Sequence, residues 1–285
     1  MPAIKVAEIT CKSAIGPCGF PGGGLAVNPY IGCEHACGYC YARFIKRFTG
    51  HTEPWGDFVD VRKNSAKLLS IQMRNPKLHH QQIYLSSMTD PYQPVEEKYE
   101  LTREILKVLV NYDNHVSIMT KSTLVLRDLD LIKQLIKKDV NFTMSTLDEK
   151  WRKVIEPNSS TTSEKLVTMQ KLVDEGIIVN AMVGPYWPIF TDIEKMMAEF
   201  KKIGVSHVFA ESFNSIGGNW TGVEETLSKH FPESLSQMKD LIFDDKKFND
   251  FYVQEKKKLE KLAKELSIPI TIYFASGHAA NKFPD

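Results

Sequence analysis

Short apolar runs recur along this chain about every 25 to 36 residues, with amphipathic stretches between them. The runs are rich in Val, Ile, Phe and Tyr and are about five or six residues long, which is typical of buried parallel strands. Because the interval matches a strand–helix unit, the sheet should be parallel. Strands are predicted at 25–28, 82–87, 116–121, 141–146, 177–184, 207–212 and 270–274. Six or seven strands fall short of the eight of a closed barrel, so we expect an α/β fold, a partial (β/α)6 TIM-like barrel.

Helical patterns fill the intervals between these strands. The stretch 96–111 carries its leucines and isoleucine on one face, which predicts one amphipathic helix. Asp128 is a candidate N-cap for a helix reaching residue 138, and Ser163 for a helix reaching residue 175. Gly176 and Gly204 stand where glycines that end helices are expected.

The two ends of the chain depart from the regular alternation. Residues 1–24 precede the first barrel strand and are expected to form an N-terminal extension. The stretch 217–250 interrupts the pattern, which indicates an insertion or lid before a long helix at 251–266. We therefore expect a barrel over 25–213 and a C-terminal helical extension over 214–285, packed together as one compact unit.

Composition restricts the location of the protein more than its partners. The formal net charge is +1, so composition alone gives no reason to expect a polyanionic partner. No stretch has the roughly 18 to 20 apolar residues that span a bilayer, and the first residues lack the order of a signal peptide. We expect a cytoplasmic protein without a membrane partner.

All five cysteines lie within the first forty residues, at Cys11, Cys18, Cys33, Cys37 and Cys40. An odd, clustered set without an export signal disfavours a disulfide framework and favours metal binding or a reactive thiol.

The last three cysteines have C-x3-C-x2-C spacing, which lets three thiolates converge on one compact cluster. Four thiolates would saturate a [4Fe–4S] cluster, whereas three leave one iron open to another ligand. Gly32 and Gly38 relieve crowding where the backbone bends around such a cluster. Cys33, Cys37 and Cys40 are therefore the candidate metal ligands.

Two simpler metal sites compete with this interpretation. The three cysteines with His35 could form a tetrahedral structural zinc site, although His35 lies inside the first loop. A saturated electron-transfer cluster would need a fourth cysteine, and Cys11 or Cys18 could supply it. Otherwise these two are ordinary, partly buried thiols.

The segment NPYIGCEHACGYCYAR at 28–43, with Tyr39 as the aromatic residue before the last cysteine, resembles the signature of the radical S-adenosylmethionine (SAM) superfamily. With SSMTDPYQPVEEKYELTR at 86–103, it is similar to the spore photoproduct lyase-related group, often labelled DNA repair photolyase-like, over residues 24–213. The resemblance implies a lyase-like enzyme that binds a [4Fe–4S] cluster and SAM. It also implies reductive cleavage of SAM to a 5′-deoxyadenosyl radical, with an electron donor such as flavodoxin or ferredoxin.

The resemblance also implies cofactor contacts at the ends of successive strands. Thr89 and Asp90 would meet the amino group of SAM, and Lys121 its carboxylate. The other implied cofactor residues are Tyr39, Tyr41 and Ser145.

In one respect the chain departs from spore photoproduct lyase. That enzyme has a hydrogen-donating cysteine near the second strand, where this chain reads Ser86-Ser87-Met88, and no cysteine follows Cys40. The resemblance therefore extends to the radical chemistry and not to repair of the same DNA lesion.

The substrate is left between two classes. Nucleic acid is favoured if a basic surface borders the cluster, with candidates Arg43, Lys46 and Arg47. A peptide, protein or small molecule is the alternative. Pocket candidates for either class are the aromatic residues Tyr186, Trp187 and Trp220, the strand residues Asn180 and Glu211, and a pair formed by Arg152 and Glu156.

Overall fold

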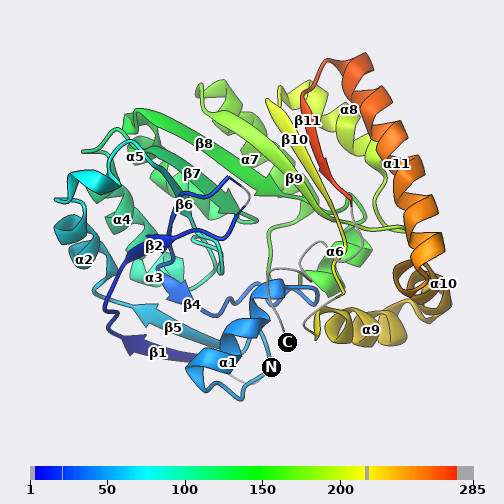
Figure 1. Ribbon diagram of the computed structural model, residues 1–285, viewed down its shortest axis with the longest axis horizontal. Coiled ribbons are helices and arrows are strands. Elements are labelled where there is room, and N and C mark those ends of the chain that lie inside the picture. Colours follow the sequence, from blue (N-terminus) through cyan, green and yellow to red (C-terminus); the bar gives the residue numbers. More distant parts are fainter. Residues whose placement is uncertain (1–3, 21, 216–217, 275–285) are drawn as a thin grey trace.

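The protein is described by a computed structural model over residues 4–20, 22–215 and 218–274. Its main sheet has the strand order β11-β10-β9-β8-β7-β6-β3-β2, and β3 to β11 run parallel (Figure 1). Among the described residues, β2 and β11 each pair with one strand only, so the barrel is open. The predicted α/β partial barrel is confirmed. The strands are β2 (Ile15–Pro17), β3 (Leu25–Val27), β6 (Gln82–Leu85), β7 (His115–Thr120), β8 (Lys137–Thr143), β9 (Ile178–Tyr186), β10 (His207–Ser212) and β11 (Ile270–Tyr273).

Alternate residues of the central strands bury their side chains under the covering helices. On β7, for example, Val116 and Ile118 are buried, while Ser117 and Met119 belong to the opposite face. The helices that follow the strands carry matching apolar faces. They are α2 (Ser65–Gln72), α4 (Leu101–Leu109), α5 (Leu129–Gln134), α6 (Glu149–Ile155), α7 (Thr162–Asp174) and α8 (Ile193–Ile203).

The residues before the barrel join two sheets. β1 (Lys5–Ile9) runs parallel to β5 (Phe58–Arg62) in a second sheet, and β4 (Tyr30–Ile31) pairs with the other edge of β5. β2 pairs antiparallel with β3 in the main sheet. The second sheet lies below the main sheet in Figure 1 and leads into the cysteine segment. Short 3-10 helices, η1 (Tyr41–Ile45), η2 (Pro76–Leu78) and η3 (Thr123–Asp128), and the one-turn helix α1 (Lys46–Thr49) complete the connections.

The predicted helix over 96–111 is wrong as a single element. It is divided at Glu100, whose φ is +50°, into α3 (Glu96–Tyr99) and α4. The Glu96 carboxylate accepts the Thr102 N–H at 3.0 Å, so a side chain replaces the backbone partner that a continuous helix would supply.

Two other helix boundaries also differ. The helix after Asp128 ends at Gln134, because residues from Lys137 onward form β8. The N-cap of α7 is Thr161, not Ser163, since Thr161 and Glu164 form a reciprocal capping box. Gly176 and Gly204 adopt positive φ after their helices, as predicted.

The stretch expected to be an insertion or lid is helical in its described part, and Gly217 lies outside the described residues. α9 (Asn219–His230), α10 (Pro232–Phe243) and α11 (Asp245–Leu266) follow one another. Val223, Leu227 and Met238 are fully buried, because apolar residues recur at helical spacing through this region. None of the helices within the described ranges has the length and apolar character needed to cross a bilayer.

Candidate active site

The three clustered cysteines lie on one loop between β4 and η1. Cys33 and Cys37 are buried and Cys40 is half-buried. Two tight turns shape the loop: Ala36 N–H donates to the Cys33 carbonyl at 3.2 Å, and Cys40 N–H to the Cys37 carbonyl at 3.1 Å. Burial, with the nearby Cys33 thiol, raises the pKa of Cys40 to about 12. The loop thus brings the three sulfurs into one buried region.

Glycines permit close packing of this loop on both sides. Gly32 has a φ of +84°, and a Cβ there would lie 2.3 Å from the Phe58 carbonyl oxygen. On the other side, a Cβ at Gly222 of α9 would lie 2.4 Å from the Gly38 carbonyl oxygen. The cysteine loop therefore lies between β5 and the C-terminal helices.

The segment after β6 holds the loop backbone with side chains. Thr89 Oγ1 donates to the Gly32 carbonyl at 2.7 Å, and Gln93 Nε2 donates to the same oxygen at 3.3 Å. Gln93 Oε1 in turn accepts the Glu34 N–H at 2.8 Å. These contacts make Thr89 and Gln93 part of a clamp on the cysteine loop.

Asp90 is surrounded by donors. Its carboxylate accepts from Tyr92 N–H, Thr120 Oγ1 and Lys121 N–H, each at 2.8 Å, and lies 3.2 Å from His35 Nδ1. Burial alone would raise the pKa of Asp90, but His35 and these donors lower it. The carboxylate thus fixes the end of β7 beside the loop, and its contact with SAM stays a prediction.

Within residues 4–20, 22–215 and 218–274, no three His, Cys, Asp or Glu side chains are gathered around a single-ion position. His35 directs Nδ1 toward Asp90. A four-iron cluster is larger than one ion and holds its thiolates further apart.

A buried carboxylate joins three of the other predicted residues. Glu156 follows α6 and is fully buried. Tyr39 donates its hydroxyl to this carboxylate, Ser145 Oγ lies 3.3 Å from it, and Lys121 Nζ lies 3.5 Å from it. Lys165 Nζ of α7 lies 3.0 Å from its second oxygen. The structure thereby brings Tyr39, Lys121 and Ser145 together.

Sequence reasoning missed Lys165, although a signal for it exists. Lys165 shares the spacing of Thr168, Met169 and Leu172, which form the buried face of α7. A lysine on the apolar face of a helix needs a buried partner. Glu156 is that partner.

The remaining predicted residues have other surroundings. Tyr41 donates its hydroxyl to the Ser87 carbonyl. Arg152 Nη1 donates to the backbone carbonyl of Glu156 at 3.0 Å, so its predicted pairing with the Glu156 carboxylate is wrong. Asn180 donates to Asn141 in the neighbouring strand at 3.1 Å.

The aromatic pocket candidates belong to the core, where Tyr186, Trp187 and Trp220 are buried. The Trp187 ring packs against the Tyr39 ring with centroids 5.5 Å apart, which supports the cysteine loop. Burial raises the pKa of Glu211, on β10, to about 7.

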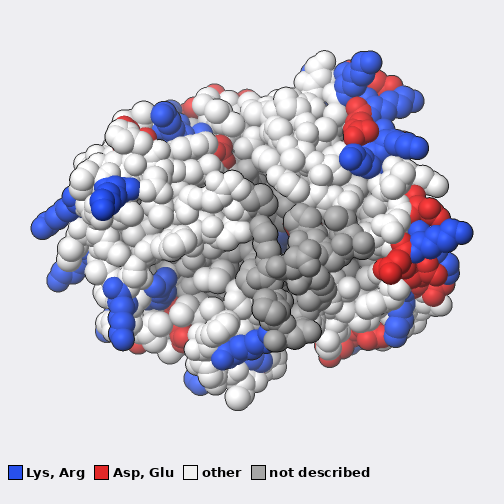
Figure 2. All heavy atoms as spheres, in the orientation of Figure 1, with Lys and Arg blue, Asp and Glu red and all other residues white. Residues whose placement is uncertain are grey.

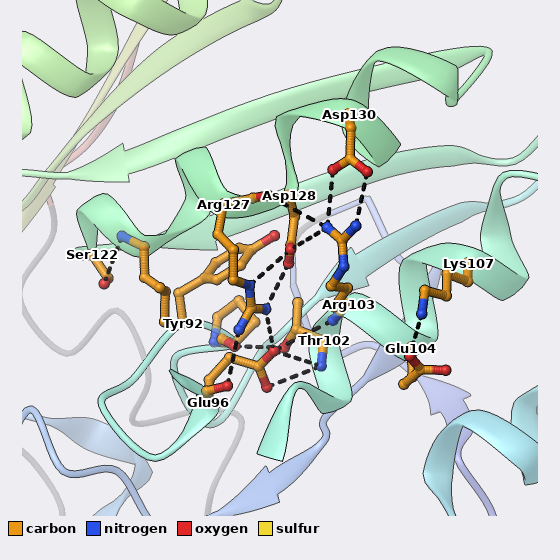
Figure 3. Close-up of polar contacts among 12 residues, drawn as sticks. Tyr92, Glu96, Thr102, Arg103, Glu104, Lys107, Ser122, Arg127, Asp128 and Asp130 are labelled. Carbon is orange, nitrogen blue, oxygen red and sulfur yellow. Dashed lines mark hydrogen bonds and ion pairs between the residues drawn. The ribbon is translucent and has the colours of Figure 1, made fainter. Parts of the chain in front are cut away.

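A second buried network anchors the segment after β6, which carries Thr89 and Gln93 (Figure 3). Arg127 Nη2 lies 2.6 Å from Glu96 and 2.8 Å from Asp128, and both carboxylates are fully buried. Arg103 connects Asp128 with Asp130. Of the two segments that carry the family resemblance, residues 86–103 thus largely support residues 28–43 structurally.

Residues 27–201 match the family described as the radical SAM superfamily. The chain belongs to the radical SAM superfamily. Membership implies an enzyme that binds an iron–sulfur cluster and SAM. The chain is also 36% identical over 200 residues to an uncharacterized protein of Methanocaldococcus jannaschii, covering 70% of this chain and 74% of that protein. A protein of Pseudomonas phage M6 described as "Radical SAM Nalpha-GlyT isomerase" is 24% identical over 225 residues, covering 76% of this chain and 45% of the phage protein.

Solved structures of spore photoproduct lyase share the fold. One mutant of that lyase superimposes with a TM-score of 0.70 at 12% identity, covering 95% of this chain and 82% of the other. A second mutant, with bound AdoMet and dinucleoside spore photoproduct, has a TM-score of 0.66 at 12% identity, with the same coverage. The chain therefore has the fold of spore photoproduct lyase.

The charge of the site suits cysteine ligands in the thiolate form. Lys121 and Lys165 share one buried carboxylate, so one positive charge is left beside the cysteine loop. Lys121 opposes the rise that burial causes in the pKa of the Cys37 thiol. Cysteine thiolates would balance this surplus.

Proposed function

We propose that this radical SAM enzyme binds a [4Fe–4S] cluster through Cys33, Cys37 and Cys40 and cleaves SAM reductively. When bound and reduced, the cluster would supply the electron that splits SAM into methionine and a 5′-deoxyadenosyl radical. The observation that carries this proposal is one buried loop with three thiols beside the ammonium group of Lys121.

The chain's own residues would bind and orient SAM. Lys121 would pair with its carboxylate, and Thr89 and Asp90 would lie near its amino group. Tyr39, Tyr41 and Ser145 would complete the site around the loop. Because the loop is packed between β5 and α9, water would be excluded from two of its sides. A flavodoxin or ferredoxin would supply the electron.

Anaerobic reconstitution with iron and sulfide, followed by reduction with dithionite, tests this function directly. We expect 5′-deoxyadenosine to form from SAM, measured by chromatography, with a known radical SAM enzyme as the positive control. If the control forms the product while this protein, carrying a full cluster, never does, the proposal fails.

We propose nucleic acid as the substrate class, based on the distribution of charge. Residues 1–80 contain ten Lys and Arg but five Asp and Glu. Figure 2 shows Lys and Arg without neighbouring Asp or Glu over α1, whereas Asp and Glu gather mainly over the C-terminal helices, where they are mixed with further Lys and Arg. Arg47 is exposed, and the neighbouring Phe48 side chain is 76% exposed, which suits stacking on an unpaired base. The bound dinucleoside in the lyase structure is consistent with this class.

Arg43, the third basic candidate, has a different role. Its Nη2 donates to the Gly38 carbonyl at 2.6 Å and its Nε to the Cys40 carbonyl at 3.1 Å. Arg43 therefore stabilises the cysteine loop, and Lys46 and Arg47 are left as the surface candidates.

Charge reversal at Lys46→Glu and Arg47→Glu together should weaken binding of a single-stranded DNA oligonucleotide at least about tenfold at low salt. The slope of log K against log salt should fall by about 1.4, because two phosphate contacts are lost. Fluorescence anisotropy measures both quantities. The matched control, Lys256→Glu with Lys257→Glu on α11, should change neither. Equal effects of the two double variants, or no binding by the wild type, would favour the peptide, protein or small-molecule alternative.

A further inference from the structure

Lys165 is placed where an ordinary lysine is costly. Its side chain is 1% exposed on the apolar face of α7, and among the described residues its ammonium group has one polar contact, with Glu156. A buried ammonium group costs several kcal/mol unless it is paired. The sequence therefore retains a charge pair at a position where an apolar residue would pack well.

The two carboxylate oxygens of Glu156 contact different groups. One oxygen accepts from the hydroxyl groups of Tyr39 and Ser145 and faces Lys121 at 3.5 Å. The other oxygen faces Lys165 at 3.0 Å and Ser159 at 3.1 Å. The shorter ion pair is thus the one on the oxygen that does not contact Tyr39 of the cysteine loop.

This arrangement determines how much of the Lys121 charge is left for a ligand. If Lys121 were the sole counter-ion of Glu156, the two would neutralise each other and Lys121 would be held against the carboxylate. With Lys165 present, Glu156 is already balanced and Lys121 keeps a net positive charge. The Lys121 ammonium group also lies over the Tyr39 ring, 5.5 Å from its centroid, on the side of the cysteine loop.

We propose that Glu156 and Lys165 are positioning residues for SAM. Lys165 neutralises Glu156, so that Glu156 can fix the Tyr39 hydroxyl and orient Lys121 without consuming the charge that binds the SAM carboxylate. This inference rests on the proposed function, in which Lys121 meets that carboxylate.

The variant Lys165→Met tests the charge argument with little change in volume. We expect the dissociation constant for SAM, measured by anaerobic calorimetry on the reconstituted protein, to rise at least about tenfold. The iron content should be unchanged. In the double variant Glu156→Gln/Lys165→Met, Lys121 is again free of a competing carboxylate, and affinity should return to within about threefold of the wild type.

The outcomes separate the two proposals. If the wild type holds a cluster but neither binds nor cleaves SAM, the proposed function fails. If it binds SAM and Lys165→Met binds it equally well, only the positioning role is overturned. A double variant as weak as Lys165→Met would also overturn it, because that result indicates a packing role. Should Lys165→Met fail to fold, Lys165→Gln, which removes the charge and keeps a polar end, takes its place with the same expected loss of affinity. The control Lys133→Met, which removes an exposed ion pair with Glu175, should leave affinity unchanged.

Discussion

Cys37→Ala is expected to remove the cluster and all SAM cleavage. Cys37 is buried, and it lies between the other two thiols in the sequence. Its loss leaves two ligands for a cluster that needs three. After reconstitution, iron should fall from about four per chain to near the background of the apoprotein. Formation of 5′-deoxyadenosine should become undetectable, a loss of at least about 10³-fold given ordinary assay sensitivity.

Cys11→Ala is the matched control for this variant. The Cys11 thiol lies 3.3 Å from Asn64 Oδ1, outside the loop, and its removal should preserve both iron and activity. Full iron content in Cys37→Ala would refute the ligand assignment. A wild-type protein that holds one zinc per chain, and does not cleave SAM, would instead support the structural zinc site.

Arg127→Met is expected to lower the free energy of unfolding by about 3–5 kcal/mol, because it leaves the buried carboxylates of Glu96 and Asp128 without their shared partner. Urea denaturation of the apoprotein under anaerobic conditions measures the change. The variant should also incorporate less iron, since Glu96 receives the Tyr30 hydroxyl and Tyr30 leads into the cysteine loop.

Lys107→Met is the matched control, because it removes an ion pair of equal length that is exposed. Lys107 Nζ lies 2.6 Å from Glu104, the same separation as in the Arg127–Glu96 pair, but both side chains are about half exposed (Figure 3). An exposed pair of this kind contributes about 0–1 kcal/mol. Similar losses for the two variants would show that burial is not what makes the Arg127 network important.

The parts of the site that could be predicted from sequence are those determined locally. Cys33, Cys37 and Cys40 lie within eight residues of each other, so their spacing alone brings the thiols together. The strands were also predictable, because apolar side chains at buried positions leave a direct trace in the sequence. Their boundaries shifted by a few residues where polar residues extend a strand, as at Lys137 in β8.

The parts that could not be predicted depend on contacts between distant segments. Nothing near Glu156 in the sequence indicates that Lys121 will meet it from the end of β7. Likewise, nothing in the sequence indicates that the Thr89 hydroxyl holds the Gly32 carbonyl. A polar residue at a strand end can face a ligand or a neighbouring loop, and only the assembled fold distinguishes the two.

The contact between Gly38 and Gly222 has a consequence for biogenesis. Chains are synthesised from the N-terminus, and α9 emerges long after the cysteine loop and the barrel strands up to β10. During that interval the loop packs against β5 but not yet against α9. Iron and sulfide delivered to a nascent chain would therefore meet a loop with one more open side than in the finished protein, where α9 packs against Gly38.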